Sequence, residues 1–201
     1  MWRLLTPDWF VPSIYDIDLD ALWAQGVRGL IVDLDNTLAR RDQPLPDERL
    51  RRWLDQARGR GFKICILSNN LEHRVQLFAR ACGVPAVHAA TKPRRRAFQR
   101  ALALIGLSPQ EAAVIGDQLF TDVLGGNRLG MVTVLVVPLP GREFIGTRLV
   151  RLGERWVLRR LARSWRGGPG GPTAPGSGAG AAGHPGTGDA DPGGEPAARD
   201  G

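Results

Sequence analysis

The stretch LIVDLDNTLA, residues 30–39, runs from three apolar residues into Asp33 and Asp35. In a β-strand, residues i and i+2 project from the same face, so the two carboxylates can point at one spot. Carboxylates that close repel each other unless a cation or a proton lies between them. A hard divalent cation relieves this repulsion, and Mg²⁺ is the usual choice where phosphate is handled. For an Asp-x-Asp pair taken alone, simple capping of the next turn is the commoner explanation.

Apolar runs typical of strands alternate with amphipathic segments along the chain. We expect strands at 29–34, 62–67, 86–88, 112–117 and 131–137, and helices at 47–60, 71–82, 93–105 and 119–128. This alternation predicts an α/β fold in which helices cover both faces of a parallel sheet. Such sheets bind ligands outside the carboxyl ends of their strands, which is where Asp33 is expected to lie.

Three more motifs place polar side chains after expected strands or at the start of a helix. ILSNN ends an apolar strand with Ser68, whose hydroxyl is suited, with nearby backbone N–H groups, to hydrogen-bond an anion. TKP supplies Lys92, a point charge for a phosphoryl oxygen, in a chain with only two lysines among 27 basic residues. VIGDQLFTD supplies Asp117 directly after a strand, and then Asp122. Together these motifs outweigh the turn-capping explanation of the first aspartate pair.

The motifs taken together resemble those of a known family. Four segments, in this order, closely resemble the motifs of the haloacid dehalogenase-like (HAD) phosphatases of subclass IIIA: DLDNT, LSNN, TKP and GDQLFTD. The upstream sequence also resembles the narrower YqeG family, through SIYDIDLDALWAQGVRGLIVDLDNTL. Eukaryotic relatives of that family include the mitochondrial phosphatidylglycerophosphate phosphatase. The resemblance covers roughly residues 4–148 and implies a HAD-like Rossmannoid fold of three layers around a parallel sheet.

The resemblance implies that the aspartates carry the reaction and hold Mg²⁺. Asp33 is implied as the nucleophile that forms an aspartyl-phosphate, and its carboxylate also ligates the metal. Asp35 is implied as the general acid and base, which protonates the leaving oxygen and then activates water. Its backbone carbonyl is the second expected metal ligand, and Asp117 supplies the third.

The resemblance also implies a set of phosphate-binding residues. Ser68, Asn69 and Lys92 are expected to hold the phosphoryl oxygens and to neutralise the charge that grows on them during transfer. Thr37 is expected to orient its loop and to contact phosphate. Asp122 is expected to act behind these groups, where it fixes Lys92 or the metal site.

The spacing between the motifs leaves no room for a cap domain. Only nine residues, 38–46, separate Thr37 from the helix expected to begin near Asp47, and no long insertion follows Ser68. HAD enzymes that act on small metabolites usually carry a cap at one of these places. A capless phosphatase domain over residues 1–147 has an open site, which resembles the family members that act on macromolecular or membrane-borne phosphates.

Charge is distributed unevenly along the chain. The chain has 27 basic and 20 acidic residues, which gives a net charge of +7. Residues 167–201 carry a net charge of −3, so the first 166 residues carry +10. A body this basic favours anionic partners such as phosphoesters, a lipid surface or nucleic acid, of which nucleic acid is the least favoured. The N-terminus lacks the unbroken apolar region of a signal peptide, and no apolar stretch is long enough to span a membrane. We therefore expect a cytoplasmic protein, peripheral at the inner membrane face if its substrate is a lipid.

Three segments outside the motifs have alternative interpretations. Residues 148–166 have the pattern of a basic amphipathic helix, which either packs on the domain through its apolar face or lies on an anionic membrane. Residues 167–201 contain 13 glycines and 6 prolines, so we expect a disordered tail. Residues 4–15 either cover the core or contact a membrane, and packing is slightly favoured.

The sequence thus supports a Mg²⁺-dependent phosphomonoester hydrolase, with phosphatidylglycerophosphate as its leading substrate. The alternative among enzymes is a phosphatase of phosphoproteins or of nucleic-acid ends. The alternative outside enzymes is a non-catalytic module, for instance an assembly partner of a GTPase. The complete set of motif residues argues against a vestigial site.

The arginines of residues 148–166 provide a test of membrane contact. We expect the triple change of Arg151, Arg155 and Arg159 to Gln to weaken binding to anionic vesicles by about 3 kcal/mol, more than a hundredfold, because each arginine contributes on the order of 1 kcal/mol near such a surface. Turnover of a soluble phosphomonoester should not change, and added salt should weaken wild-type binding. Vesicle sedimentation measures the effect, and wild-type protein that stays in the supernatant at low salt would remove the membrane hypothesis.

Overall fold

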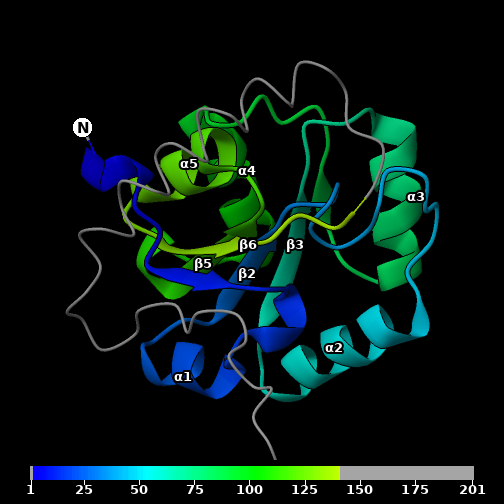
Figure 1. Ribbon diagram of the computed structural model, residues 1–201, viewed down its shortest axis with the longest axis horizontal. Coiled ribbons are helices and arrows are strands. Elements are labelled where there is room, and N and C mark those ends of the chain that lie inside the picture. Colours follow the sequence, from blue (N-terminus) through cyan, green and yellow to red (C-terminus); the bar gives the residue numbers. More distant parts are fainter. Residues whose placement is uncertain (1, 141–201) are drawn as a thin grey trace, which may run out of the picture.

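Among the residues that the structure describes, six parallel strands form one sheet in the order β1-β6-β5-β2-β3-β4. Figure 1 shows this sheet at the centre of the computed structural model. The structure describes residues 2–140. The strands are β1 (Trp9–Val11), β2 (Gly29–Val32), β3 (Lys63–Leu67), β4 (Ala86–Val87), β5 (Ala112–Gly116) and β6 (Val132–Val136). The α/β fold with a parallel sheet, predicted from the alternating pattern, is confirmed.

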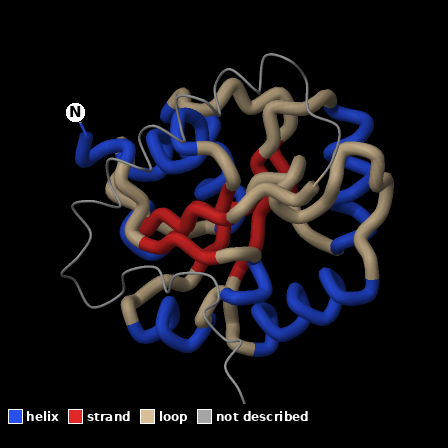
Figure 2. Tube along the Cα trace, viewed as in Figure 1, coloured by secondary structure: helices blue, strands red, loops and turns tan. Residues whose placement is uncertain are grey.

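Helices cover both faces of this sheet, as Figure 2 shows in blue around the red strands. The helices are α1 (Leu19–Ala24), α2 (Glu48–Gly59), α3 (Glu72–Cys82), α4 (Arg95–Ile105) and α5 (Leu124–Asn127). Apolar residues of α1, α2 and α3 share one core with side chains of β2, β3, β5 and β6. Apolar residues of α4 share a second core with the opposite faces of β2, β3 and β5. The result is the three-layer arrangement that the family resemblance implies.

The helix boundaries follow from local sequence signals. Asp47 caps the start of α2 by accepting a hydrogen bond from the backbone N–H of Leu50 at 2.8 Å. The apolar residues that face the core recur at helical spacing, and they are Leu50, Trp53, Leu54 and Ala57. Both α3 and α4 end at a glycine in the left-handed conformation, Gly83 and Gly106.

The register of the central strands brings the motif residues to one edge of the sheet. Val32 of β2 lies opposite Ile66 of β3 on one side and Ile115 of β5 on the other. The residues that follow these three strands therefore lie close together at the carboxyl edge. Within residues 2–140 no cap domain covers this edge, in agreement with the short spacing between the motifs.

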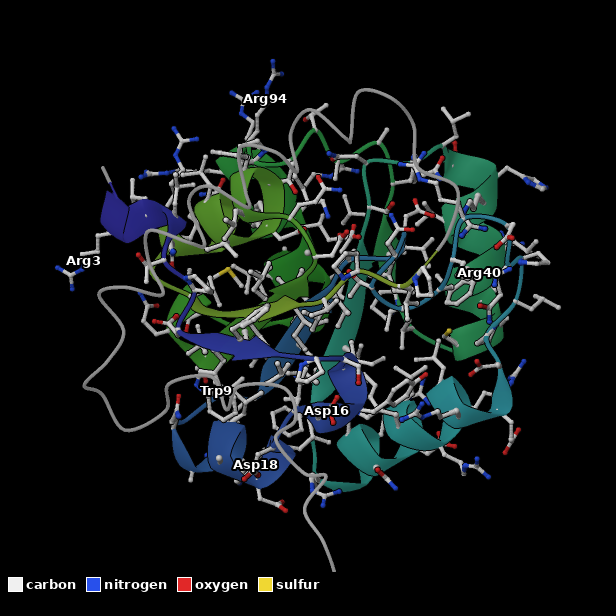
Figure 3. The ribbon with its side chains drawn as sticks, in the orientation of Figure 1. Arg3, Trp9, Asp16, Asp18, Arg40 and Arg94 are labelled. Carbon is white, nitrogen blue, oxygen red and sulfur yellow. The ribbon has the colours of Figure 1, made fainter. Side chains whose placement is uncertain are left out.

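The N-terminal segment supplies an additional strand that the sequence patterns did not reveal. Strand β1 pairs in parallel with β6, with Trp9 opposite Val134, and it forms an edge of the sheet. Trp9, Val11 and Tyr15 pack against the core formed by α1, α2 and α3, and Figure 3 shows Trp9 beside α1. Of the two interpretations of residues 4–15, the described contacts bear out the one in which the segment covers the core.

The expected helix over residues 119–128 is divided in two. Residues Leu119–Val123 form a π-helical turn, and α5 continues from Leu124. Single π-turns often occur at functional sites, and this one carries Asp122. The expected helix at 93–105 begins two residues later, at Arg95, because residues 92–94 form the loop that leads into it.

Several expectations concern residues outside the described range. The basic segment 148–166 and the tail 167–201 both lie there, as does the end of the domain expected over residues 1–147. Within residues 2–140, no helix is both long enough and apolar enough to cross a membrane.

Gly125 is a position where a side chain cannot be added without moving the core. A Cβ at Gly125 would lie 2.2 Å from ring atoms of Phe98 in α4, so Gly125→Ala should lower the free energy of unfolding by about 1–3 kcal/mol. The control is Gly59→Ala in α2, where nothing lies within 4 Å and the helix should gain stability. Urea denaturation measures both variants, and equal stability of the two would contradict the close packing of α4 and α5.

Candidate active site

A small pocket opens at the carboxyl edge of the sheet, where the predicted residues converge. Its volume is about 160 Å³, and the predicted residues that line it are Asp33, Asp35, Ser68, Asn69 and Lys92. Asp33 follows β2 directly, and its backbone N–H donates to the carbonyl of Ile115 in β5 at 2.9 Å. The parallel ladder thus extends one residue beyond the strand and fixes the backbone that carries the expected nucleophile.

Lys92 forms buried ion pairs with two of the predicted aspartates, Asp33 and Asp122. Its Nζ lies 2.5 Å from Asp33 Oδ1 and 2.7 Å from Asp122 Oδ1, and its side chain is only 3% exposed. Burial alone would lower the pKa of Lys92, but the negative charges of Asp122 and Asp33 outweigh it and raise that pKa above its ordinary value. Lys92 therefore remains charged. Burial raises the pKa of Asp33, while the charge of Lys92 opposes this shift.

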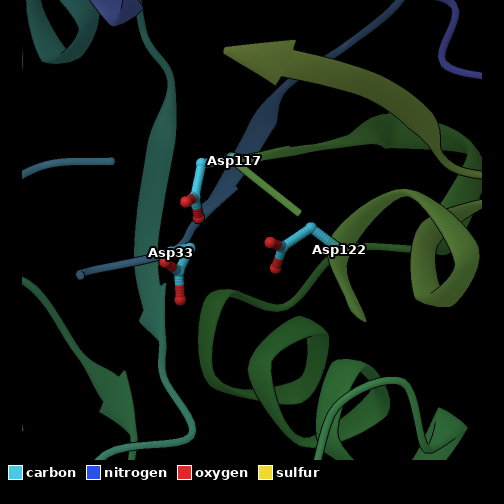
Figure 4. Close-up of side chains that lie close together, drawn as sticks. All are labelled: Asp33, Asp117 and Asp122. Carbon is cyan, nitrogen blue, oxygen red and sulfur yellow. The ribbon is translucent and has the colours of Figure 1, made fainter. Parts of the chain in front are cut away.

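Three buried aspartates lie close enough together to share a cation. One carboxylate oxygen from each of Asp33, Asp117 and Asp122 lies within 4.8 Å of the others. Figure 4 shows how the three side chains lie. Hard carboxylate oxygens in this number are the donors that a divalent cation such as Mg²⁺ accepts. Three buried carboxylates this close together repel one another, so the residues present fit a bound metal cation beside Lys92.

Asp122 is held in place on both of its oxygens. Oδ1 accepts from Lys92, and Oδ2 accepts from the backbone N–H of Gln118 at 3.3 Å and from the hydroxyl of Thr121 at 3.3 Å. The missing side chain of Gly116 makes room for it, because a Cβ there would lie 2.3 Å from the carboxyl carbon of Asp122. These contacts hold Asp122 beside Lys92.

Asp35 faces the pocket with its carboxylate bound from two sides. Asn70 donates through Nδ2 to Oδ2 at 2.9 Å, and Arg74 donates through Nε to Oδ1 at 3.0 Å. The next residue, Asn36, adopts the left-handed backbone conformation (φ 65°), which asparagine tolerates better than most residues. This turn carries the chain away from the pocket after Asp35.

The expected phosphate-binding residues occupy different environments. Ser68 is buried, and its Oγ accepts from the backbone N–H of Asn70 at 3.1 Å. The side-chain oxygen of Asn69 accepts from the backbone N–H of Lys92 at 2.8 Å, so Asn69 joins the loops that follow β3 and β4. The hydroxyl of Thr37 is buried without a hydrogen bond among the described residues, and Thr37 is not among the residues that line the pocket.

Sequence reasoning missed four lining residues and one residue behind the pocket. Arg41, Asn70, Gln118 and Thr121 also line it, and Arg74 binds Asp35 from the first turns of α3. Asn70, Gln118 and Thr121 lie inside the quoted motifs and were readable there. Arg41 and Arg74 lie among many arginines, and no local pattern distinguishes them from solvated surface charge.

Comparison with known proteins identifies the family. The model of the haloacid dehalogenase-like hydrolases matches residues 7–130. The probable phosphatase YqeG of Bacillus subtilis (strain 168) is 44% identical over 161 residues, which cover 80% of this chain and 94% of that protein. The chain belongs to the HAD-like hydrolases. Within them it is a HAD-type phosphatase, so its substrate is phosphorylated, and the resemblance to the YqeG family is confirmed.

This HAD phosphatase also has relatives with a named lipid substrate. Phosphatidylglycerophosphate phosphatase 1, chloroplastic, of Chlamydomonas reinhardtii is 31% identical over 171 residues, which cover 78% of this chain and 62% of that protein. The chloroplastic/mitochondrial enzyme of the same name from Arabidopsis thaliana is 28% identical over 172 residues, covering 80% of this chain and 49% of that protein. The chain thus spans about half to three fifths of the length of these two relatives.

Removal of the Lys92 charge should destabilise the HAD phosphatase strongly. Lys92→Met leaves Asp33 and Asp122 buried without their cation, and we expect the free energy of unfolding to fall by about 3–5 kcal/mol in metal-free buffer. The control is Lys63→Met, which changes the exposed lysine at the start of β3 and should cost less than about 0.5 kcal/mol. Urea denaturation measures both. A Lys92→Met protein as stable as Lys63→Met would show that the aspartates do not depend on Lys92.

Proposed function

We propose that this HAD phosphatase hydrolyses phosphomonoesters through an aspartyl-phosphate on Asp33, and that its substrate is phosphatidylglycerophosphate at a membrane surface. The observation that carries the catalytic part is the buried ion pair of Lys92 with Asp33 and Asp122, next to Asp117. Lys92 and Asp33 also line the pocket. Such a cluster is costly to bury. Phosphoryl transfer uses the same groups, because it needs an anionic nucleophile beside fixed positive charge.

In the first step the carboxylate of Asp33 attacks the phosphorus atom, and the bond to the leaving oxygen breaks. Asp35 enters this step protonated and donates that proton to the leaving oxygen, so that an alcohol departs and Asp35 becomes a carboxylate. Lys92 and Ser68 line the pocket. Lys92 would neutralise charge on the phosphoryl oxygens, and the Ser68 hydroxyl would donate a hydrogen bond to one of them. Mg²⁺, held by Asp33, Asp117 and the backbone carbonyl of Asp35, would supply the remaining positive charge that lets two anions approach.

In the second step Asp35, now a carboxylate, takes a proton from water as the water attacks the phosphorus. The bond between phosphorus and the Asp33 oxygen breaks, which releases inorganic phosphate and restores the Asp33 carboxylate. The proton that Asp35 gave to the alcohol is replaced by one from water. Both steps place the reacting oxygen on the same side of the phosphoryl group, within reach of Asp35.

The proposed lipid substrate draws on three observations. The pocket volume of about 160 Å³ suits a phosphoryl group and its immediate surroundings, so the rest of a larger substrate has to lie outside. Within residues 2–140 no cap encloses it. The two eukaryotic relatives named above act on phosphatidylglycerophosphate by their names. A phosphatase of phosphoproteins or of nucleic-acid ends would share the first two features, and only the relatives favour the lipid.

A substrate screen with Mg²⁺ tests this choice. Phosphate release is measured with phosphatidylglycerophosphate in detergent micelles, a phosphopeptide and a 5′-phosphorylated oligonucleotide at equal concentrations. The proposal predicts the highest kcat/KM for the lipid. Higher kcat/KM for the peptide or the oligonucleotide would replace the lipid and keep the phosphatase mechanism.

Asp33→Asn should abolish turnover and leave the fold intact. Asparagine has nearly the shape of aspartate but cannot form an acyl phosphate. We therefore expect kcat to fall by at least about 1000-fold, as is typical when a catalytic nucleophile is removed. Acid-quenched wild-type protein should carry a phosphoryl group that hydroxylamine releases, and the variant should carry none. If the variant kept more than about a tenth of the wild-type kcat, Asp33 would not be the nucleophile.

A further inference from the structure

Arg74 contacts the proposed acid/base from outside the motifs. It lies in α3, and its guanidinium is 3.0 Å from Asp35 Oδ1 with a side chain that is only 19% exposed. An ion pair this sheltered from water is screened far less than one on an open surface. Asn70 holds the other carboxylate oxygen at 2.9 Å, so the orientation of the Asp35 carboxylate is fixed on both sides.

The same guanidinium also binds the loop that follows Asp35. Nη1 donates to the backbone carbonyl of Gln43 at 2.9 Å, and Nη2 donates to that of Arg40 at 2.9 Å. Figure 3 shows Arg40 beside α3. The rigid fork of an arginine can make these bonds and the carboxylate contact at once, which a lysine cannot. Asp35, its loop and α3 are therefore joined through one side chain.

Arg74 acts from behind the acid/base. Asp35 and Asn70 line the pocket, whereas Arg74 is absent from its described lining. A group in this position does not touch the phosphoryl group or the leaving oxygen. Its influence on the reaction has to pass through the placement of the Asp35 carboxylate, and misplacement of a catalytic group by about 1 Å can cost a hundredfold in rate.

We propose that Arg74 is a positioning residue that holds the Asp35 carboxylate at the distance needed for proton transfer to the leaving oxygen. The inference rests on the proposed function, because it presupposes that Asp35 is the acid and base. A purely structural arginine, which only fastens the loop to α3, would affect folding alone. The two roles differ in how the variant handles different leaving groups.

Substrates with different leaving groups distinguish a positioning role of Arg74 from a purely structural one, because only some leaving groups need a proton in order to depart. The p-nitrophenolate anion departs without protonation, whereas the alcohol of glycerol 3-phosphate needs the proton of Asp35. The ratio kcat/KM reports the steps up to departure of the leaving group, since transfer to Asp33 is the first irreversible step. Loss of correct positioning should therefore lower kcat/KM for glycerol 3-phosphate selectively.

The experiment measures both substrates with saturating Mg²⁺ for wild type and for Arg74→Gln. We expect kcat/KM to fall about 10- to 100-fold for glycerol 3-phosphate and less than about threefold for p-nitrophenyl phosphate. The value of kcat should fall for both substrates, because the water step uses Asp35 in each case. In an Asp35→Asn background, Arg74→Gln should have no further effect on kcat.

Arg58 offers a matched control. Its guanidinium also donates to backbone carbonyls, those of Cys82 and Gly83, and so ties α2 to the end of α3 far from the pocket. Arg58→Gln should lower the thermal midpoint about as much as Arg74→Gln and leave both kcat/KM values unchanged. Arg74→Lys keeps the positive charge but not the three-way contact, so it should show the same selective fall in kcat/KM for glycerol 3-phosphate, to a smaller extent.

The outcomes separate the inference from the function on which it rests. An equal loss on both substrates, or no loss on either, would overturn the role of Arg74 and leave the phosphatase mechanism standing. Persistence of the Arg74→Gln effect in the Asp35→Asn background would also overturn it. A wild-type protein that releases phosphate neither from these two substrates nor from phosphatidylglycerophosphate would overturn the proposed function together with the inference.

Discussion

The arrangement of charged residues at the carboxyl edge of the sheet depends on one buried ammonium group, that of Lys92. Lys92 lies between Asp33 and Asp122, and a parallel sheet brings these residues together from three separate loops. Each carboxylate would be costly to bury alone, and each would repel the others. With Lys92 between them they become a preorganised array of charge, so no large rearrangement is needed when a phosphate dianion arrives. The stability of the edge and its chemistry therefore have the same source.

The array works because the sheet leaves little freedom around it. Strands β2 and β5 continue their ladder through Asp33, and the missing side chain of Gly116 makes room for Asp122. Asn69 fixes the backbone of Lys92 itself, which ties the loop after β3 to the loop after β4. The second set of contacts, around Asp35, forms a separate network through α3. One network holds the proposed nucleophile and the other holds the proposed acid/base.

The amino-acid sequence predicted the central part of this molecule well. The apolar runs of β2, β3 and β5 and the polar residues after them were readable because buried parallel strands and their ends have strong local signatures. Strand β1 was not readable, since its three residues gain their conformation from pairing with β6. Arg74 was hidden for a related reason: an arginine on a helix has the same local signature whether it faces water or a carboxylate 39 residues away in sequence. Asn69 was singled out as an expected phosphate-binding residue. Its contact with the backbone of Lys92 could not be predicted, because it depends on tertiary structure.

Because Lys92 is buried, the described surface exposes a single lysine side chain. The chain has only two lysines, and the other one, Lys63, is exposed at the first residue of β3. That end of the strand is the edge of the sheet opposite the pocket. Of the two lysines, only Lys63 is therefore accessible to reagents that acylate free amines at neutral pH. Coupling through it would attach the protein to a solid support or a fluorophore with the catalytic edge directed outward.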